Sequence, residues 1–73
     1  MKFYLTGQYG DLVLEVDLLP KQGDSITIEA PMVKWKEYPR GDNYLGKTYE
    51  LLAKGKIQTQ FGELRRFVVK MKS

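Results

Sequence analysis

Apolar and polar residues alternate along much of this chain. Leu12, Leu14, Val16 and Leu18 follow one another at every second position, which is the period of a β-strand with one face toward water. The segment 65–72 repeats the pattern near the C-terminus. These two segments predict strands whose apolar side chains form one side of a small core.

Shorter segments with the same period lie between turn residues. Phe3 and Leu5 share one strand face, and the glycine-bracketed segment 7–11 then predicts a hairpin turn. Pro20 and Gly23 end the strand over 12–18, since proline cannot donate to a ladder and glycine tolerates positive φ. Further strands are predicted around 26–28 and 33–38.

Two aromatic residues have the phase of core side chains. Trp35 shares a strand face with Val33, and Phe67 shares one with Val69. Both rings are therefore expected to point inward, where a small domain uses large apolar groups. The segment 39–47 contains Pro, Gly, Asp and Asn, and is predicted to be the longest and most mobile loop.

The segment 49–58 allows two interpretations. Its apolar positions alternate with polar ones, but Leu52 and Gly55 interrupt the period, which favours a bent or bulged strand. Alternatively, Thr48 caps a short helix over 49–54 that Gly55 ends.

Taken together, these elements predict one mainly β domain over residues 1–73, with five or six strands in a small antiparallel sheet or a partly open barrel. The stretch 19–28, Leu-Pro-Lys-Gln-Gly-Asp-Ser-Ile-Thr-Ile, resembles a strand-turn-strand element of SH3-like barrels in small phage proteins. That resemblance implies the SH3-like form of the barrel.

Composition narrows the chemistry that the chain can perform. It contains no His and no Cys, so the commonest general base, metal ligand and thiolate nucleophile are missing. We expect no metal, no cofactor and no catalytic residues, hence a protein that is not an enzyme. The longest apolar run is short, from Leu12 to Leu14, so no membrane span is expected and the predicted location is the cytoplasm.

Charge is distributed unevenly along the sequence. Residues 1–33 carry two Lys and five acids, a net charge of −3, whereas residues 34–73 carry ten Lys or Arg and four acids, a net charge of +6. Because residues two apart share a strand face, we expect the cations of the second half to form one outer basic face. Its predicted members are Lys34, Lys36, Lys54, Lys56, Arg66, Lys70 and Lys72. A basic face binds phosphate or an acidic protein surface, although lysines also solvate a thin sheet and protect its edges.

Four other residues are secondary candidates for partner contact. Tyr38 and Tyr44 are the aromatic side chains best placed to stack on a base beside the cations. Glu15 and Asp17 share a strand face and predict a weakly anionic strip that could meet arginines of a partner.

Small size, solubility, the absence of catalytic groups and polarised charge are typical of a protein that occupies the surface of a partner. In these respects the chain resembles small phage-encoded host-takeover proteins, which include an inhibitor and antiterminator of bacterial RNA polymerase. The resemblance implies binding to a host protein, RNA polymerase, with inhibition of initiation or altered termination. A nucleic-acid-binding barrel that uses the same cations is the alternative, and an accessory structural module of a larger assembly is a third class.

Overall fold

The structure is a computed structural model that describes residues 1–36 and 39–72, with the backbone alone at residue 36 and residues 39–41. It contains six strands and two short 3-10 helices. In chain order they are β1 (Lys2–Gly7), β2 (Gly10–Glu15), β3 (Ser25–Thr27), η1 (Ala30–Met32), β4 (Val33–Lys36), η2 (Pro39–Tyr44), β5 (Thr48–Thr59) and β6 (Gly62–Met71). The mainly β prediction is confirmed, and β5 is a strand where the alternative had a helix over 49–54.

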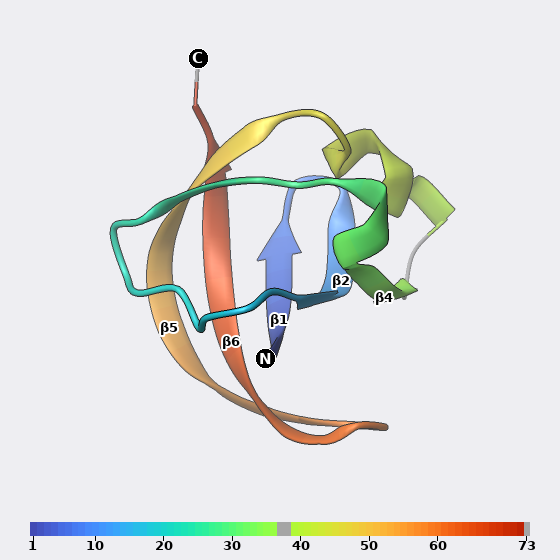
Figure 1. Ribbon diagram of the computed structural model, residues 1–73, viewed down its shortest axis with the longest axis vertical. Helices are drawn as coiled ribbons and strands as arrows, with labels where there is room; N and C mark the ends of the chain where they lie inside the picture. The colour runs from blue at the N-terminus through green and yellow to red at the C-terminus, as the bar shows by residue number, and fades with distance from the viewer. Residues whose placement is uncertain (37–38, 73) are drawn as a thin grey trace.

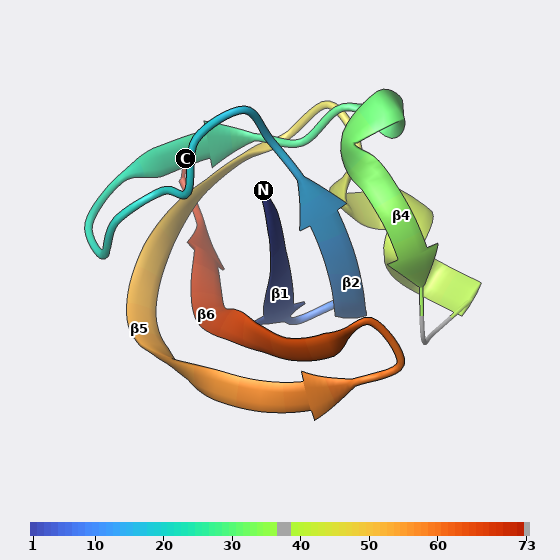
Figure 2. The ribbon, with the colours of Figure 1, turned by 60° about the horizontal axis from the view of Figure 1, so that its bottom comes forward.

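The six strands form one curled sheet in the order β3-β5-β6-β1-β2-β4. Neighbouring strands are antiparallel except for β1 and β6, which run parallel, so the sheet is mixed. Figure 1 shows how the long β5–β6 hairpin bends around the shorter strands, and Figure 2 shows the sheet as a half-barrel. The C-terminal strand β6 therefore lies in the middle of the sheet.

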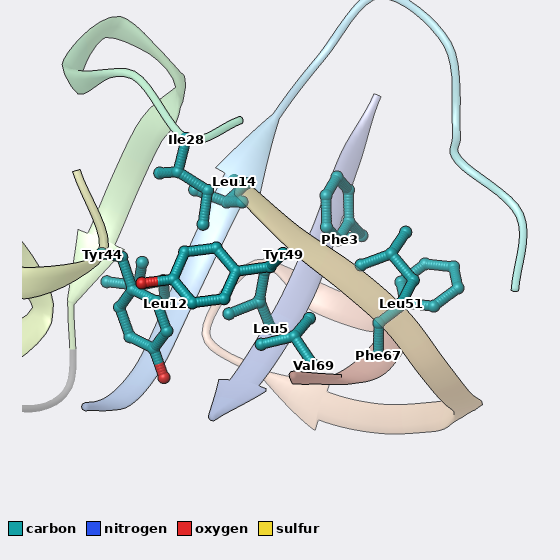
Figure 3. Close-up of a cluster of buried hydrophobic side chains, with 10 residues drawn as sticks. All are labelled: Phe3, Leu5, Leu12, Leu14, Ile28, Tyr44, Tyr49, Leu51, Phe67 and Val69. Carbon is teal, nitrogen blue, oxygen red and sulfur yellow. The ribbon is translucent and has the colours of Figure 1, made fainter. Parts of the chain in front are cut away.

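The inner face of the half-barrel holds the core. Ten buried side chains meet there, and Figure 3 shows how they converge from both sides of the curl: Phe3, Leu5, Leu12, Leu14, Ile28, Tyr44, Tyr49, Leu51, Phe67 and Val69. The rings of Phe3 and Phe67 meet edge to face at 5.5 Å. The predicted inward phase of Phe67 is confirmed.

Strand β5 contains a β-bulge that changes which residues face the core. Leu51 lies opposite Val69 and Ala53 lies opposite Val68, so Leu52 is an extra residue without a partner on β6. Since directly opposed residues of an antiparallel pair share a face, Lys54 lies on the face of Phe67. The bulge predicted in this segment is confirmed, and because one inserted residue reverses the alternation, Ala53 does not share the inner face of Leu51.

A second irregularity reverses the phase of Trp35. Val33 pairs with Leu14, but Trp35 pairs with Val13, which points away from the core occupied by Leu14. Trp35 accordingly packs against Tyr4 on the outer face, with the two ring centroids 6.2 Å apart, and is half-buried. Its predicted inward position is wrong, because the bulge separates its face from that of Val33.

One further prediction changes in the structure. The strand predicted over 12–18 ends at Glu15, and Leu18 is 82% exposed in the connection to β3. At the point where β2 ends, Val16 donates its N–H to the Met1 carbonyl at 2.9 Å. Within the described residues, no helix is long and apolar enough to cross a membrane.

Candidate functional site: the cationic hairpin

The hairpin formed by β5 and β6 carries a large share of the positive charge of the protein. Residues 48–72 contain six Lys or Arg, half of the twelve in the chain, and two acids, Glu50 and Glu63, a net charge of +4. The hairpin has a curved inner face that continues the core and an outer face turned toward solvent (Figure 2). The two faces carry different cations.

Three cations lie on the inner face of the hairpin, beyond the edge of the core. Lys54 is opposite Phe67, and Lys56 is opposite Arg65, so these side chains share the face of the core residues. We call Lys54, Lys56 and Arg65 the inner cationic set. Lys54 and Lys56 are two residues apart on a strand, a separation of about 6–7 Å.

The inner cationic set is exposed and weakly neutralised. Lys56 pairs with Glu63 at 3.7 Å, and both side chains are more than 60% exposed. Lys54 and Arg65 are also exposed and have no ion pair within residues 1–36 and 39–72. An exposed ion pair such as that of Lys56 contributes about 0–1 kcal/mol, so Glu63 competes weakly with an acidic partner.

The remaining hairpin cations belong to the outer face. Arg66 donates from Nε to Thr6 Oγ1 at 3.2 Å, which ties this side chain to β1. Lys70 lies opposite Glu50, and Lys72 donates from Nζ to Ser25 Oγ at 2.9 Å. The predicted single basic face is therefore wrong in one respect: the bulge at Leu52 divides its members between two faces.

The predicted cations of β4 lie outside the hairpin. Lys34 Nζ lies 3.3 Å from Glu15 Oε1. This ion pair joins one member of the predicted basic face to one member of the predicted anionic strip. For Lys36 the structure describes the backbone alone. Asp17 is exposed beyond the end of β2, so it no longer shares a strand with Glu15.

The two tyrosines predicted to stack on bases have different outcomes. Tyr38 lies outside the described residues. Tyr44 is fully buried at the end of η2, where its hydroxyl donates to the Gly10 carbonyl at 2.6 Å and accepts from the Tyr9 N–H at 3.2 Å. The expectation of an exposed ring at Tyr44 is wrong, because this ring packs in the core against Tyr9 and Tyr49.

A small aromatic cluster on the outer face was not anticipated. Trp35 packs against Tyr4, and Phe61 at the tip of the hairpin meets Trp35 edge to face at 6.3 Å. The Lys2 ammonium lies 4.8 Å from the centroid of the Phe61 ring. These contacts hold the tip of the hairpin against the first strand.

A second cation meets an aromatic ring elsewhere on the surface. Lys47 Nζ lies 4.9 Å from the centroid of the Tyr9 ring and donates to the Tyr9 hydroxyl at 3.3 Å. This hydrogen bond from Lys47 lowers the pKa of Tyr9 below 10.0, with a smaller lowering by a hydrogen bond from Gln8. Tyr9 is thus a partner of Lys47 within this chain.

Arg65 is the member of the inner cationic set that the sequence analysis missed. It lies two residues before Phe67, so the alternation alone indicates that Arg65 shares the inner face. Its place opposite Lys56 depends on the strand register, which one sequence does not contain. Among the described residues, no three acidic side chains gather closely enough to hold a metal ion.

Comparisons with known proteins add no relative to this description. No family model matches the chain, no curated protein matches it, and no solved structure matches its fold.

Proposed function

We propose that this protein acts by binding, without catalysing a reaction, and that its inner cationic set contacts an acidic surface of a partner protein. The observation that carries the proposal is the group of three exposed cations on one face of the hairpin, two of them without an ion pair in the described part of the chain. Unpaired charges of one sign accelerate encounter with an opposite surface and select against like-charged partners.

RNA polymerase of a bacterial host is the specific partner that we propose, with inhibition of initiation or altered termination as the consequence. This choice rests on the resemblance to small phage-encoded host-takeover proteins. The chain would then act in the cytoplasm of a bacterial host.

The position of the aromatic rings favours a protein partner over nucleic acid. Sequence-tolerant binding of single strands uses exposed rings among the cations, because bases stack on them. Near Lys54, Lys56 and Arg65 the described aromatic residues on the same face are Phe3 and Phe67, and both are fully buried. The inner cationic set can therefore contact phosphate but offers no stacking surface among the described residues.

The nucleic-acid alternative rests on a different observation. Phe61 is 39% exposed and Trp35 is half-buried, and Lys2 lies directly over the Phe61 ring. A base could stack on these rings while Lys2 meets its phosphate. In that case the binding surface would be the outer aromatic cluster and not the inner cationic set.

A pair of charge-reversal variants tests the proposal. Lys54→Glu with Lys56→Glu should weaken binding to purified bacterial RNA polymerase by at least about tenfold, because two attractive contacts become repulsive. The matched control reverses Lys70 and Lys72, which lie on the outer face. It should change the affinity by less than about twofold, and each exposed substitution should change the unfolding free energy by about 0.5 kcal/mol or less.

A parallel titration with a single-stranded DNA oligonucleotide distinguishes the alternative. If DNA binds and the inner reversal lowers the slope of log affinity against log salt by about 0.7 per lost phosphate contact, the ligand of this face is nucleic acid. Equal affinity of both reversal variants for RNA polymerase would contradict the proposed use of the inner face.

A further inference from the structure

Strand β5 is longer than β3, the strand that pairs with it on the side away from β6. β3 pairs with Thr48, Tyr49 and Glu50, and the residues preceding β3 extend this contact to Leu51 through hydrogen bonds with Gly23 and Asp24. Beyond that point, no described residue pairs with β5 on the side away from β6. Residues 52–59 therefore form an open sheet edge, visible at the outer rim of the hairpin in Figure 2.

The register determines which backbone groups this edge presents. Thr59 and Gly62 are opposite each other across a two-residue turn, the arrangement in which a pair exchanges both hydrogen bonds. Every second pair along an antiparallel ladder does the same, so Ile57 and Gly55 also direct their N–H and C=O groups toward β6. The backbone groups of Lys54, Lys56 and Gln58 consequently point outward from the edge.

The side chains along this edge leave room for another strand. Gly55 has no side chain, and a Cβ built at its position would have no neighbour within 4 Å. An open hollow of about 280 Å³ lies along this edge, lined by Ala53, Gly55, Arg66 and Val68 of the outer face together with Lys54 and Lys56. Small residues beside an unpaired backbone allow a second backbone to approach closely.

The charge of the edge selects the kind of strand that can be added. Unpaired edges with lysines resist pairing with neutral or identical strands, which is a common protection against aggregation. If two copies of β5 paired antiparallel about Gly55, Lys54 of one would face Lys56 of the other, and like charges directly opposite are destabilising. An acidic strand meets the same lysines as cross-strand partners of opposite charge.

We propose that the open edge of β5 binds an extended segment of a partner protein as an added strand, with acidic side chains two residues apart facing Lys54 and Lys56. The inference rests on the proposed function, since it specifies what the inner cationic set recognises. In this binding mode main-chain hydrogen bonds supply affinity and alternate side chains supply specificity. The outward N–H and C=O groups of Lys54, Lys56 and Gln58 provide the main-chain hydrogen bonds. The ammonium groups of Lys54 and Lys56 provide the specificity for acidic side chains.

The test uses a synthetic peptide of alternating glutamate and threonine, titrated at low ionic strength and followed by amide chemical shifts. Gln58→Pro removes one outward N–H without altering charge, and edge strands tolerate proline where the N–H faces solvent. We expect this variant to bind the peptide at least about fivefold more weakly than the control Gln58→Ala, as expected for the loss of about 1 kcal/mol of main-chain hydrogen bonding. A second control, Lys54→Gln with Lys56→Gln, removes the charges and keeps the backbone.

The outcomes separate the two proposals. If the lysine variant binds weakly while Gln58→Pro and Gln58→Ala bind equally, the charges matter and strand addition is refuted. If neither the lysine variant nor Gln58→Pro loses affinity, the proposed function fails as well. Should Gln58→Pro not fold, amide exchange of the unaltered protein decides: exchange at Lys54, Lys56 and Gln58 should slow at least about tenfold in the complex, and unchanged exchange refutes the added strand.

Discussion

Tyr44 and Tyr49 pack against each other in the core, with ring centroids 5.2 Å apart, but their hydroxyl groups have different surroundings. The Tyr44 hydroxyl donates to Gly10 and accepts from Tyr9, so it joins the first hairpin to η2. The Tyr49 hydroxyl is buried and has no hydrogen-bond partner among the described residues. Hydrogen bonds compensate for the free-energy cost of burying the Tyr44 hydroxyl, whereas the cost of burying the Tyr49 hydroxyl is not compensated.

This contrast predicts opposite effects of removing the two hydroxyl groups. Tyr44→Phe should lower the unfolding free energy by about 1–3 kcal/mol, because it leaves polar backbone groups of the turn without their partner. Tyr49→Phe should leave stability unchanged or raise it slightly, since it removes an unsatisfied group. Urea unfolding of both variants checks the pair, and an equal loss in the two would contradict it.

The same burial predicts a response to alkaline pH. Burial raises the pKa of Tyr44 from 10.0 to about 12, and burial also raises the pKa of Tyr49. A group whose pKa is raised in the folded state keeps its full contribution to stability below pH 10, and loses it as the pH rises toward 12. Across that interval the unfolding free energy should fall more steeply in the native protein than in Tyr44→Phe, and parallel curves would contradict the assignment.

Gly7 is a position where the core excludes a side chain. A Cβ at Gly7 would lie 2.6 Å from the Tyr44 hydroxyl oxygen and 2.9 Å from Val69 Cγ2. Gly7→Ala should therefore destabilise the protein by about 1–3 kcal/mol through overpacking. Gly55→Ala is the matched control, since a Cβ there meets nothing within 4 Å, and it should leave the melting temperature nearly unchanged.

At the scale of whole elements, the two bulges decide how far sequence reasoning succeeds. The alternation at Leu12 and Leu14 and around Phe67 predicted buried strand residues correctly, because the extra residues of the two bulges lie on the neighbouring strands β4 and β5. Between Leu51 and Ala53, however, the sequence does not reveal which residue is the extra one, and a slip of one residue moves every later side chain to the opposite face. The inner cationic set could therefore not be separated from the outer cations without the register.

The loop after β4 shows a second limit of the same reasoning. A single core aromatic such as Tyr44, placed among Gly, Asp and Asn residues, has no period that would reveal its burial. The turn residues around it predict a loop over 39–47, where the structure has the short 3-10 helix η2, and they do not predict that Tyr44 fixes this segment in the core. The mobility predicted for 39–47 stays a prediction that relaxation measurements can test.

The tip of the β5–β6 hairpin depends on one ring contact. Phe61→Ala should cost about 1 kcal/mol, because it removes the edge-to-face contact with Trp35 and the cation–π contact with Lys2. Fluorescence of Trp35, the single tryptophan, should shift to longer wavelength as the ring loses its cover. Leu18→Ala is the control: this side chain is 82% exposed, and neither stability nor fluorescence should change.

Across the whole molecule, the sheet joins segments that are far apart in sequence. The parallel contact of β1 with β6 pairs Phe3 with Arg65, and the long hairpin adds most of its contacts only once β6 is present. Such non-local pairing requires closure of long loops before contacts compensate for the lost entropy, which makes folding slow compared with that of helical domains.

The central position of β6 has a consequence for synthesis on the ribosome. β1 and β2 emerge first and can form a hairpin, but the strand that joins them to β5 is the last of the six to be translated. Until then Phe3 and Leu5 lack Phe67 and Val69, with which they share the core. The core therefore cannot assemble before β6 has emerged, and a chain truncated before β6 would lack this core and become a substrate for proteases and chaperones.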